Sequence, residues 1–333
     1  MGVPGDAGLE FFIFGHPVTM SPSPEIHSVG FSENGSPHRY DRFDAENAEV
    51  VVEKLRSASC GGGSVTIPHK ETLLPKMDSL SEAARVIGAV NTITKGDDGK
   101  LHGDNTDWLG IKNQLEARMA AIGKGQQQQS GLVCLLCGSG GTARAAAFAL
   151  REMGAARVLI FNRTASRAEA LAKEFGFEAI SDLGKLTSID KLDIVVDTLP
   201  GSTAFELPDS SVLQRCTPVV FEAAYIPRRT TFVEQALAAG CEVVEGIEML
   251  FEQGCAQCEL WTRKPAPRAK IASNLLKNLF TEGSSHPAHG KMQPYDMPPA
   301  SLIAEAKGIG KRGLLEDKAA VMEEPVRSSR RVG

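Results

Sequence analysis

The stretch LVCLLCGSGGTARAAAFALREM, residues 132–153, decides the fold of this chain. Leu132–Leu136 is an apolar run that predicts a buried strand, and the glycine-rich run Gly138–Ala143 predicts a turn. Arg144–Met153 then has the composition of a helix. A strand, a glycine turn and a helix in this order are typical of a parallel α/β sheet.

The glycine turn is also a candidate phosphate site. Glycine permits a tight turn, and it lets backbone N–H groups approach a pyrophosphate at the N-terminus of the next helix, where the helix dipole favours negative charge. The spacing is G-x-G-G-x-A, with Gly138, Gly140 and Gly141, and not the common G-x-G-x-x-G. Because a similar turn can precede any helix, the motif alone indicates a dinucleotide only weakly.

The next predicted strand, Val158–Phe161, sharpens this interpretation. A fold that binds NAD places an acidic residue at the end of this strand, against the ribose 2′-hydroxyl. Here the strand is followed by Asn162, Arg163 and Thr164, with Arg167 shortly after. A guanidinium can pair bidentately with a 2′-phosphate. The sequence therefore predicts NADP, while a solvated arginine at a helix start is the alternative.

Alternating strands and helices extend to both sides of this stretch. On the N-terminal side, Phe11–Phe14, Ala45–Ser57 and Ser64–Ile67 form a strand, helix and strand pattern that predicts a parallel α/β layer. On the C-terminal side we expect strands at Ile194–Asp197, Val219–Phe221 and Glu242–Val244, and helices at Ser166–Phe175, Thr231–Ala239, Gly246–Thr262 and Ala269–Phe280. Gly123–Ser130 between the two blocks is polar and predicts a solvated linker.

Composition limits the function classes. The chain has 333 residues, of which 42% are hydrophobic and 23% charged, with a net charge of -5. These values predict two globular domains and give no basic surface for nucleic acid. No apolar run approaches the ~20 residues of a membrane helix. Met1–Glu10 has no basic residue and no long apolar stretch, so a cytoplasmic location is expected.

The cysteines give no sign of a metal site. Of seven cysteines, two pairs have C-x-x-C spacing: Cys134 with Cys137, and Cys255 with Cys258. The first pair lies in an apolar strand-like run, and the second lies in a helix-like run with no histidine nearby. We expect buried or free thiols, because reduced cysteine behaves as a small hydrophobe.

Three polar clusters mark the first domain, and they sit at the ends of predicted strands. They are residues 21–27 (SPSPEIH), residues 64–70 (SVTIPHK), and residues 88–92 (GAVNT) together with 103–107 (GDNTD). Lys70 follows a strand and a proline, which places it at the sheet edge where open α/β sheets bind ligands. Taken singly, Lys70 is equally compatible with a surface lysine, and Asp107 with a residue that caps the helix Trp108–Met119.

The order and spacing of these clusters resemble the shikimate dehydrogenase family over residues 11–280. The matching motifs are S-x-S-P-x-x-H at 21–27, V-T-I-P-x-K at 65–70, G-A-V-N-T at 88–92, G-D-N-T-D at 103–107, G-x-G-G-x-A-R at 138–144, N-R-T at 162–164, Y-I-P at 225–227, and Met249 to Gln253. In detail they look most like the shikimate dehydrogenase domain of the fungal pentafunctional aromatic-pathway polypeptide.

The resemblance implies an α/β fold with four parts. These are a substrate-binding and catalytic α/β domain (9–112), a Rossmann-like NADP-binding domain with a parallel sheet (130–245), C-terminal helices that pack on the first domain (246–281), and a tail (282–333). The tail is rich in Pro, His, Gly, Ser and charge, so we expect it to be mobile, with room for one weak helix.

The resemblance also implies roles for individual residues in the reduction of 3-dehydroshikimate to shikimate. Lys70 and Asp107 would be the catalytic pair, with Lys70 as the proton donor. The substrate carboxylate would be held by Ser21, Ser23 and Tyr225, and the ring hydroxyls by Thr66, Asn91 and Gln253. The residues that would bind NADP are Gly138, Ser139, Gly140, Gly141, Thr142, Ala143, Asn162, Arg163, Thr164, Arg167, Thr198 and Gly246.

Two residues depart from the family pattern. Ser64 stands where the family usually has asparagine, so one ring-hydroxyl contact could be looser. His69, beside Lys70, stands where Phe or Leu is common. A charged imidazole there would favour the neutral form of the lysine, and a loop histidine bonded to the backbone is the alternative.

Three functions remain open at this point. The first is NADP-dependent shikimate dehydrogenase activity, and the second is oxidation of quinate or another cyclic polyol acid. The third is a regulator that binds the metabolite without turning it over. The small-molecule substrate is the expected partner, with no nucleic acid and no membrane, in a monomer or homodimer. The sequence does not indicate the direction of the reaction in the cell or the role of the tail.

Overall fold

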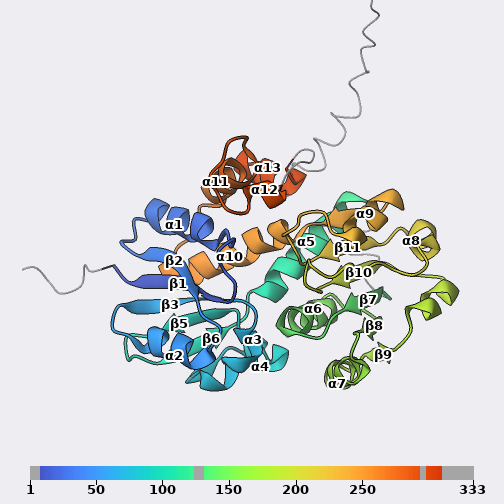
Figure 1. Cartoon of the computed structure of the whole chain (residues 1–333), viewed down its shortest axis with the longest axis horizontal. Helices are drawn as coiled ribbons and strands as arrows, with labels where there is room; N and C mark the ends of the chain where they lie inside the picture. The colour runs from blue at the N-terminus through green and yellow to red at the C-terminus, as the bar shows by residue number, and fades with distance from the viewer. Residues whose placement is uncertain (1–7, 124–130, 293–297, 310–333) are drawn as a thin grey trace, which may run out of the picture.

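A computed structural model describes residues 8–123, 131–292 and 298–309 of the chain. Its elements form two halves, each built on a sheet of six strands (Figure 1). The strands of the first sheet lie within Glu10–Asp104, and those of the second lie within Val133–Val244. The predicted linker at 123–130 falls almost wholly outside the described residues. The predicted domain boundaries stay predictions.

The first sheet has the strand order β2-β1-β3-β5-β6-β4. Its strands are β1 (Glu10–Gly15), β2 (Arg39–Asp44), β3 (Cys60–Val65), β4 (Ser79–Leu80), β5 (Thr92–Lys95) and β6 (Leu101–Asp104). β1 is parallel to β2 and β3, as the pattern predicts, but β5 is antiparallel to β3 and to β6. The short turn at residues 96–100 joins β5 to β6 directly, and such a connection returns the chain antiparallel.

Helices flank this sheet and lead to the second half. They are α1 (Ser23–Glu33), α2 (Ala48–Arg56), α3 (His69–Thr72), α4 (Glu82–Ile87) and α5 (Asp107–Ala121), with a 3-10 turn η1 at Leu74–Lys76. Asn47 caps α2 and Ser81 caps α4, because each side chain accepts a hydrogen bond from a backbone N–H of its helix.

The second sheet is wholly parallel, with the order β12-β11-β10-β7-β8-β9. Its strands are β7 (Val133–Cys137), β8 (Arg157–Phe161), β9 (Glu178–Ile180), β10 (Ile194–Asp197), β11 (Val219–Glu222) and β12 (Val243–Val244). Its helices are α6 (Gly141–Glu152), α7 (Ala165–Phe175), η3 (Leu183–Ser188), α8 (Ser211–Cys216) and α9 (Thr231–Ala238). The chain leaves β7 toward β8 and returns to β10 on the other side, so the strand order switches at the end of β7, where such sheets bind ligands.

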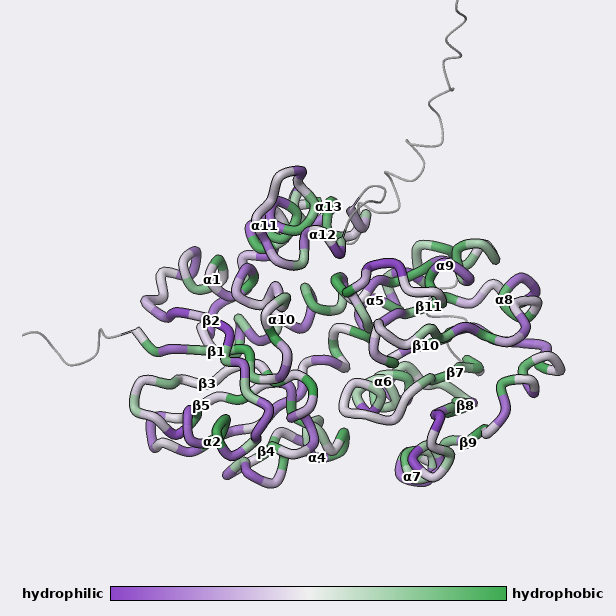
Figure 2. Tube along the Cα trace, viewed as in Figure 1, coloured by the Kyte–Doolittle hydropathy of each residue, from purple (hydrophilic) through white to green (hydrophobic). Residues whose placement is uncertain are grey.

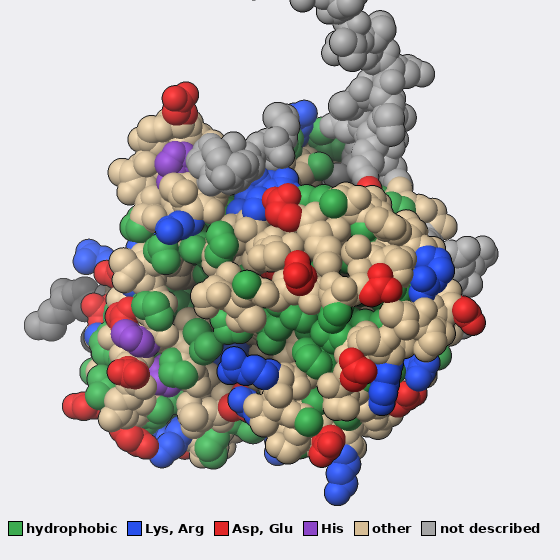
Figure 3. Space-filling view, turned by 45° about the vertical axis from the view of Figure 1, so that its right-hand side comes forward, with side chains coloured by type: hydrophobic (Ala, Val, Ile, Leu, Met, Phe, Trp, Pro, Cys, Tyr) green, Lys and Arg blue, Asp and Glu red, His purple; other side chains and the backbone are tan. Residues whose placement is uncertain are grey.

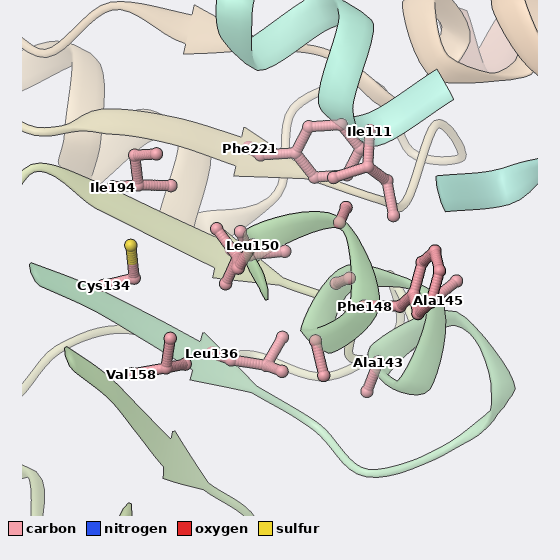
Figure 4. Close-up of a cluster of buried hydrophobic side chains, with 14 of the residues drawn as sticks. Ile111, Cys134, Leu136, Ala143, Ala145, Phe148, Leu150, Val158, Ile194 and Phe221 are labelled. Carbon is pink, nitrogen blue, oxygen red and sulfur yellow. The ribbon is translucent and has the colours of Figure 1, made fainter. Parts of the chain in front are cut away.

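One apolar core joins the two halves. Figure 4 shows Ile111 of α5 close to Phe221 of β11, with Leu150 and Phe148 of α6 packed over the sheet. The same cluster includes Ile87 of α4, from the first half. The second sheet is therefore held against the first half by buried side chains and not by a linker alone.

Two long helices return from the second half to the first. α10 (Gly246–Thr262) packs against α5 and α1, and α11 (Arg268–Phe280) packs against α1. Both match the predicted ranges closely. Figure 1 shows α10 crossing the middle of the molecule, where it lies beside α5.

The segment after α11 corrects part of the sequence prediction. Residues 282–333 are predicted to be mobile, yet α12 (His289–Met292) and α13 (Ala300–Ala306) both pack against α11. Ala288, Met292 and Leu302 are buried in the α11 cluster. The segment is poor in apolar residues, so the sequence did not indicate that these three pack against α11. Residues 310–333 lie outside the described part of the chain.

Two further elements differ from expectation. β2 has the sequence RYDRFD, and only Tyr40 in it is buried, so its charges conceal an edge strand. Figure 2 shows this hydrophilic edge in purple. Ser23–His27, expected at a strand end, instead begins α1, with Pro24 in the first turn, where proline is tolerated.

The cysteine prediction holds for both C-x-x-C pairs. Cys134, Cys137, Cys255 and Cys258 are all buried, and burial raises the pKa of each thiol. Among the residues that the structure describes, no helix is long and apolar enough to cross a membrane, and no cluster of three His, Cys, Asp or Glu side chains is arranged to hold a metal ion.

Candidate functional site

Lys70 and Asp107 meet at the junction of the two halves. The chain leaves β3 through a cis peptide bond between Ile67 and Pro68 and enters α3, which carries Lys70. Asp107 is the first residue of α5. The Lys70 Nζ lies 2.5 Å from the Asp107 Oδ2, and the two side chains are 14% and 4% exposed. The pair is therefore largely shielded from water but still reachable.

Asn91 holds the other oxygen of Asp107. The Asn91 Nδ2 donates to the Asp107 Oδ1 at 2.8 Å, and it also lies 3.0 Å from the Gln253 Oε1. The Asn91 Oδ1 accepts from the backbone N–H of Thr106 at 2.7 Å. Because Asn91 and Gln253 are buried, this network fixes the carboxylate before any ligand arrives.

Thr142 connects the lysine to the glycine turn. The Lys70 Nζ donates to the Thr142 Oγ1 at 3.1 Å. A Cβ on Gly141 would lie 2.8 Å from the Lys70 Cβ, so the turn and the lysine are in close contact. The sequence placed Thr142 among the cofactor residues, and the structure places its side chain on the lysine.

Ser21, Ser23 and Tyr225 form a second polar group. The Ser21 hydroxyl donates to the Ser23 Oγ at 3.1 Å. Burial raises the pKa of Tyr225, and a hydrogen bond with Ser21 partly offsets this effect. The Arg42 guanidinium donates to the Ser21 carbonyl oxygen at 2.6 Å, which fixes the loop that carries the serines. These three residues come from two different halves of the chain, as the resemblance requires.

The Arg42 contact extends to the segment after α11. The His286 Nε2 lies 3.2 Å from the Arg42 Nη2 and 3.4 Å from the Glu25 Oε2. His286 is buried, and burial lowers its pKa. The segment predicted as a tail therefore supports the loop that holds Ser21.

Thr66 stands apart from both groups. Its backbone N–H donates to the Phe14 carbonyl at 2.8 Å. Within the described part of the chain its side chain makes no hydrogen bond with protein, and it is partly exposed.

The glycine turn has the geometry of a backbone cradle. Gly138 has a φ of 116°, which favours glycine, and a Cβ there would lie 2.2 Å from the Thr198 Oγ1. Gly140 and Gly141 then begin α6, a helix of 12 residues. Ser139 lies in the same turn, and Ala143 lies in the first turn of α6. Gly246 begins α10, where a Cβ would lie 2.4 Å from the Ala223 carbonyl oxygen.

The predicted 2′-phosphate residues lie beside this turn. The Gly138 N–H donates to the carbonyl of Phe161, the last residue of β8, at 2.9 Å. Arg163, Thr164 and Arg167 follow directly and are exposed. Asn162 donates to the Thr164 carbonyl at 3.0 Å. With no carboxylate in residues 162–164, a helix N-terminus and two exposed guanidinium groups, this edge fits an NADP-type dinucleotide.

A buried carboxyl pair at this edge was not predicted. Asp197 ends β10 and Glu222 ends β11, and the two are neighbours in register. Both are buried, and burial raises the pKa of each, with the Asp197 charge raising that of Glu222 further. Thr230 donates to the Glu222 Oε2 at 2.7 Å. The signal in the sequence was an acidic residue at the end of each apolar strand.

The two departures from the family pattern have defined partners. The His69 ring nitrogen Nε2 lies 2.7 Å from the Ala45 carbonyl oxygen, which agrees with a loop histidine bonded to the backbone. Ser64 bonds to Tyr40 and to Gln257, each at 2.7 Å. Gln257 was missed, although it lies four residues after Gln253, on the same face of α10.

One face of the molecule has a mixed surface. On the face drawn in Figure 3, hydrophobic side chains gather in a band across the middle of the molecule, with basic side chains beside it. Acidic and basic side chains are interspersed over the rest of this face.

Three family descriptions match the sequence. Residues 13–93 match the shikimate dehydrogenase substrate binding domain, residues 121–208 match shikimate / quinate 5-dehydrogenase, and residues 246–273 match the shikimate 5'-dehydrogenase C-terminal domain.

Individual relatives agree with these matches. The pentafunctional AROM polypeptide of Yarrowia lipolytica is 39% identical over 282 residues, which are 81% of this chain and 18% of that polypeptide. The chain thus spans about a fifth of the curated relatives that it matches. The structure resembles shikimate 5-dehydrogenase from Thermus thermophilus in complex with NADP(H) and shikimate, with 32% identity, a TM-score of 0.68, and coverage of 80% of this chain and 98% of that one.

A further solved structure has a different substrate in its name. The 5-ketofructose reductase of a Gluconobacter strain is 28% identical, with a TM-score of 0.66 and coverage of 80% of this chain and 98% of that one.

Proposed function

The chain belongs to the shikimate dehydrogenase family, and we propose that it catalyses the reversible, NADPH-dependent reduction of 3-dehydroshikimate to shikimate. The observation that carries the proposal is the shielded Lys70–Asp107 pair, which is bonded to Asn91 on one side and to the glycine turn on the other. In this role Lys70 would give its proton from between the polar side chains around Asn91 and the glycine turn, which supports the proposal.

Lys70 supplies the proton in the reduction. When bound, NADPH supplies a hydride to the carbonyl carbon. The ammonium of Lys70 stabilises the negative charge that grows on the carbonyl oxygen and then transfers a proton to it. In the oxidation, the neutral lysine accepts that proton. Asp107 keeps the ammonium oriented and binds the same hydroxyl.

The remaining polar groups bind the carboxylate and the ring hydroxyls of the substrate. Ser21, Ser23 and Tyr225 offer hydroxyl donors to the substrate carboxylate, and Thr66, Asn91 and Gln253 bond to ring hydroxyls. A site of this kind rejects an analogue that lacks a hydroxyl, because its own buried groups would lose their partner.

The edge of the second sheet holds the cofactor. The backbone of the Gly138–Ala143 turn binds the pyrophosphate, with Thr198 and Gly246 beside the bound dinucleotide. Arg163 pairs with the 2′-phosphate, with Arg167, Asn162 and Thr164 close by. The absence of an acidic side chain in residues 162–164 supports NADP over NAD.

One panel of assays tests the proposal. Purified protein is given shikimate or quinate, each with NADP or NAD, and the nicotinamide absorbance is followed. We expect turnover of shikimate with NADP to exceed the other three combinations. Quinate is included because one matching description names both acids, and 5-ketofructose is tested in the reducing direction.

The outcomes separate the alternatives. Preferred turnover of quinate would assign the second function proposed from the sequence. Binding of NADP and shikimate without turnover of any substrate would indicate the metabolite-binding regulator. The cytoplasmic location and the monomer or homodimer stay predictions.

A further inference from the structure

Gln257 is buried behind the substrate site and is bonded on all sides. Its Nε2 donates to the Asn91 carbonyl oxygen at 3.1 Å and to the Thr92 Oγ1 at 2.9 Å. Its Oε1 accepts from the Ser64 hydroxyl at 2.7 Å and lies 3.1 Å from the His27 Nε2. The side chain is 0% exposed, so no bond to solvent replaces any of these contacts.

These contacts fix the orientation of the Gln257 amide. A backbone carbonyl can only accept a hydrogen bond, so the Asn91 carbonyl requires the amide nitrogen on its side. The amide oxygen must then face Ser64. Because an amide oxygen can only accept, the Ser64 hydroxyl must donate its single hydrogen to Gln257.

Tyr40 occupies a second position on Ser64. The Tyr40 hydroxyl lies 2.7 Å from the Ser64 Oγ. Since the hydrogen of Ser64 is already used, Tyr40 must be the donor. A hydroxyl oxygen has two lone pairs, so one lone pair of Ser64 stays available, and the hydroxyl has no hydrogen left to give.

We propose that Gln257 is a positioning residue that makes Ser64 an obligate acceptor in the substrate site, so that a ring hydroxyl of the substrate must donate to it. This inference rests on the proposed function and on the family resemblance, which implies a ring-hydroxyl contact at position 64. Ser64 and Thr66 are two residues apart, and alternate residues of an extended segment lie on one face. An asparagine at position 64 would carry its own amide to the hydroxyl, whereas here a serine is held in one orientation by an amide behind it.

The consequence is that the site selects a hydrogen-bond donor at one ring position of the substrate. A ring substituent that only accepts, such as fluorine or a ketone oxygen, would face a lone pair and be rejected. Releasing Ser64 from Gln257 would free its hydrogen and relax this selection. The loss of one neutral hydrogen bond predicts an effect of about tenfold in substrate affinity.

The experiment compares Gln257→Met, Ser64→Ala and the double variant. We expect Gln257→Met to raise the shikimate KM about tenfold, while kcat and the NADP KM change less than about twofold. In the Ser64→Ala background the same substitution should have little further effect on the shikimate KM, because Gln257 acts through Ser64. Gln235→Met is the matched control, since Gln235 also bonds to backbone groups, of Leu207, but lies on α9.

Fluorinated shikimates, each with one ring hydroxyl replaced, test this selection. At one ring position, wild-type protein should bind the fluorinated analogue much more weakly than shikimate. At that position Gln257→Met should show the smallest difference in affinity between the analogue and shikimate. If Gln257→Met does not fold, Ser64→Asn and Ser64→Asn/Gln257→Ala provide the test. The single variant should lose substrate affinity because its amide faces Gln257, and the double variant should recover most of it.

Distinct results overturn the inference and the proposed function. The role of Gln257 would be refuted if Gln257→Met changed the shikimate KM equally in the wild-type and Ser64→Ala backgrounds, or did not change it at all. It would also be refuted if the Ser64→Asn/Gln257→Ala variant did not recover substrate affinity. Wild-type protein that binds NADP but does not turn over shikimate would refute the proposed function instead.

Discussion

The polar residues at the edges of the two sheets differ in burial and in hydrogen bonding. Asn91, Asp107 and Gln253 are buried in the first half and bonded to one another, whereas Arg163 and Arg167 in the second half are exposed. The substrate half is thus preorganised, and its groups compensate one another before a ligand binds. The nucleotide half offers backbone N–H groups and solvated cations, which gain partners only from the cofactor. A substitution in the Asn91 network should therefore affect both stability and activity, and one at Arg163 or Arg167 should affect cofactor binding alone.

Lys70→Met should have the largest effect, because Lys70 touches both halves. Loss of the proton donor should lower kcat by about 1,000-fold, within the range for general acid catalysis. Steady-state kinetics measure this loss, and circular dichroism checks the fold. Lys76→Met is the matched control, since Lys76 forms an exposed pair with Glu49. Retention of more than a tenth of kcat in Lys70→Met would argue against a catalytic role for the lysine.

Asn91→Ala should show the coupling of stability and activity in the substrate half. The Asp107 carboxylate and the Thr106 N–H would both lose a buried partner. At roughly 1–3 kcal/mol for each unsatisfied group, the free energy of unfolding should fall by about 3 kcal/mol. Urea titration measures this fall, alongside kcat. Asn278→Ala on α11, which removes a bond to the Asn274 carbonyl, should cost less than about 1 kcal/mol. Equal losses would mean that the network is not preorganised.

Arg163→Ala should separate binding from stability in the nucleotide half. Loss of a charged hydrogen bond should raise the NADP(H) KM by about 10- to 100-fold and leave the NAD(H) KM nearly unchanged. The melting temperature should stay constant, because the side chain is exposed. Arg157→Ala, at the opposite end of β8, is the control. Equal changes for NADP(H) and NAD(H) would remove the 2′-phosphate assignment.

Glu222→Gln tests the buried carboxyl pair at the nucleotide edge and has the smallest expected effect. Burial and the neighbouring Asp197 raise the pKa of Glu222 from 4.5 to about 8. The folded protein therefore holds a proton that the unfolded chain releases above pH 4.5, so stability should fall as the pH rises from about 4.5 toward about 8. The neutral glutamine should flatten this fall and raise the melting temperature by a few degrees near pH 8.

The matched control for this last variant is Glu234→Gln, since Glu234 is 63% exposed in α9. It should leave the pH dependence of the melting temperature unchanged. A wild-type melting temperature that does not fall between pH 5 and 8, or a Glu222→Gln variant with the same slope as wild type, would show that the carboxyl pair is not the cause.

The two halves also differ in how many of their strands and helices could be predicted from the sequence. Most strands of the nucleotide half follow from apolar runs, and β10 has the predicted bounds. The short elements β9 and α8 were not predicted. β2 was missed because only Tyr40 of its residues is buried. A helix in the segment of α13 was expected only as a weak one without a position, because its packing against α11 cannot be read from local sequence. The spacing of apolar residues in the local sequence predicts neither the edge strand β2 nor the packing of α13.

The candidate site shows the same limit. Lys70 and Asp107 could be chosen from motif order, and the structure brings them together. Gln257 could not, because its bond to Ser64 joins residues 193 positions apart. Thr142 was assigned to the cofactor from its place in the glycine turn, and its contact with Lys70, 72 positions away, was not predicted. Side chains that act across the junction need the fold before they can be recognised.

The bond that Gln257 makes with Ser64 has a consequence for how this protein can evolve. Neither residue can change its chemistry without leaving the other unpaired inside the protein, so a new substrate preference would require two substitutions, each harmful alone. The two are therefore expected to vary together among relatives, as an epistatic pair. The exposed arginines after β8 carry no such constraint, and cofactor preference could drift by single steps while substrate preference stayed fixed.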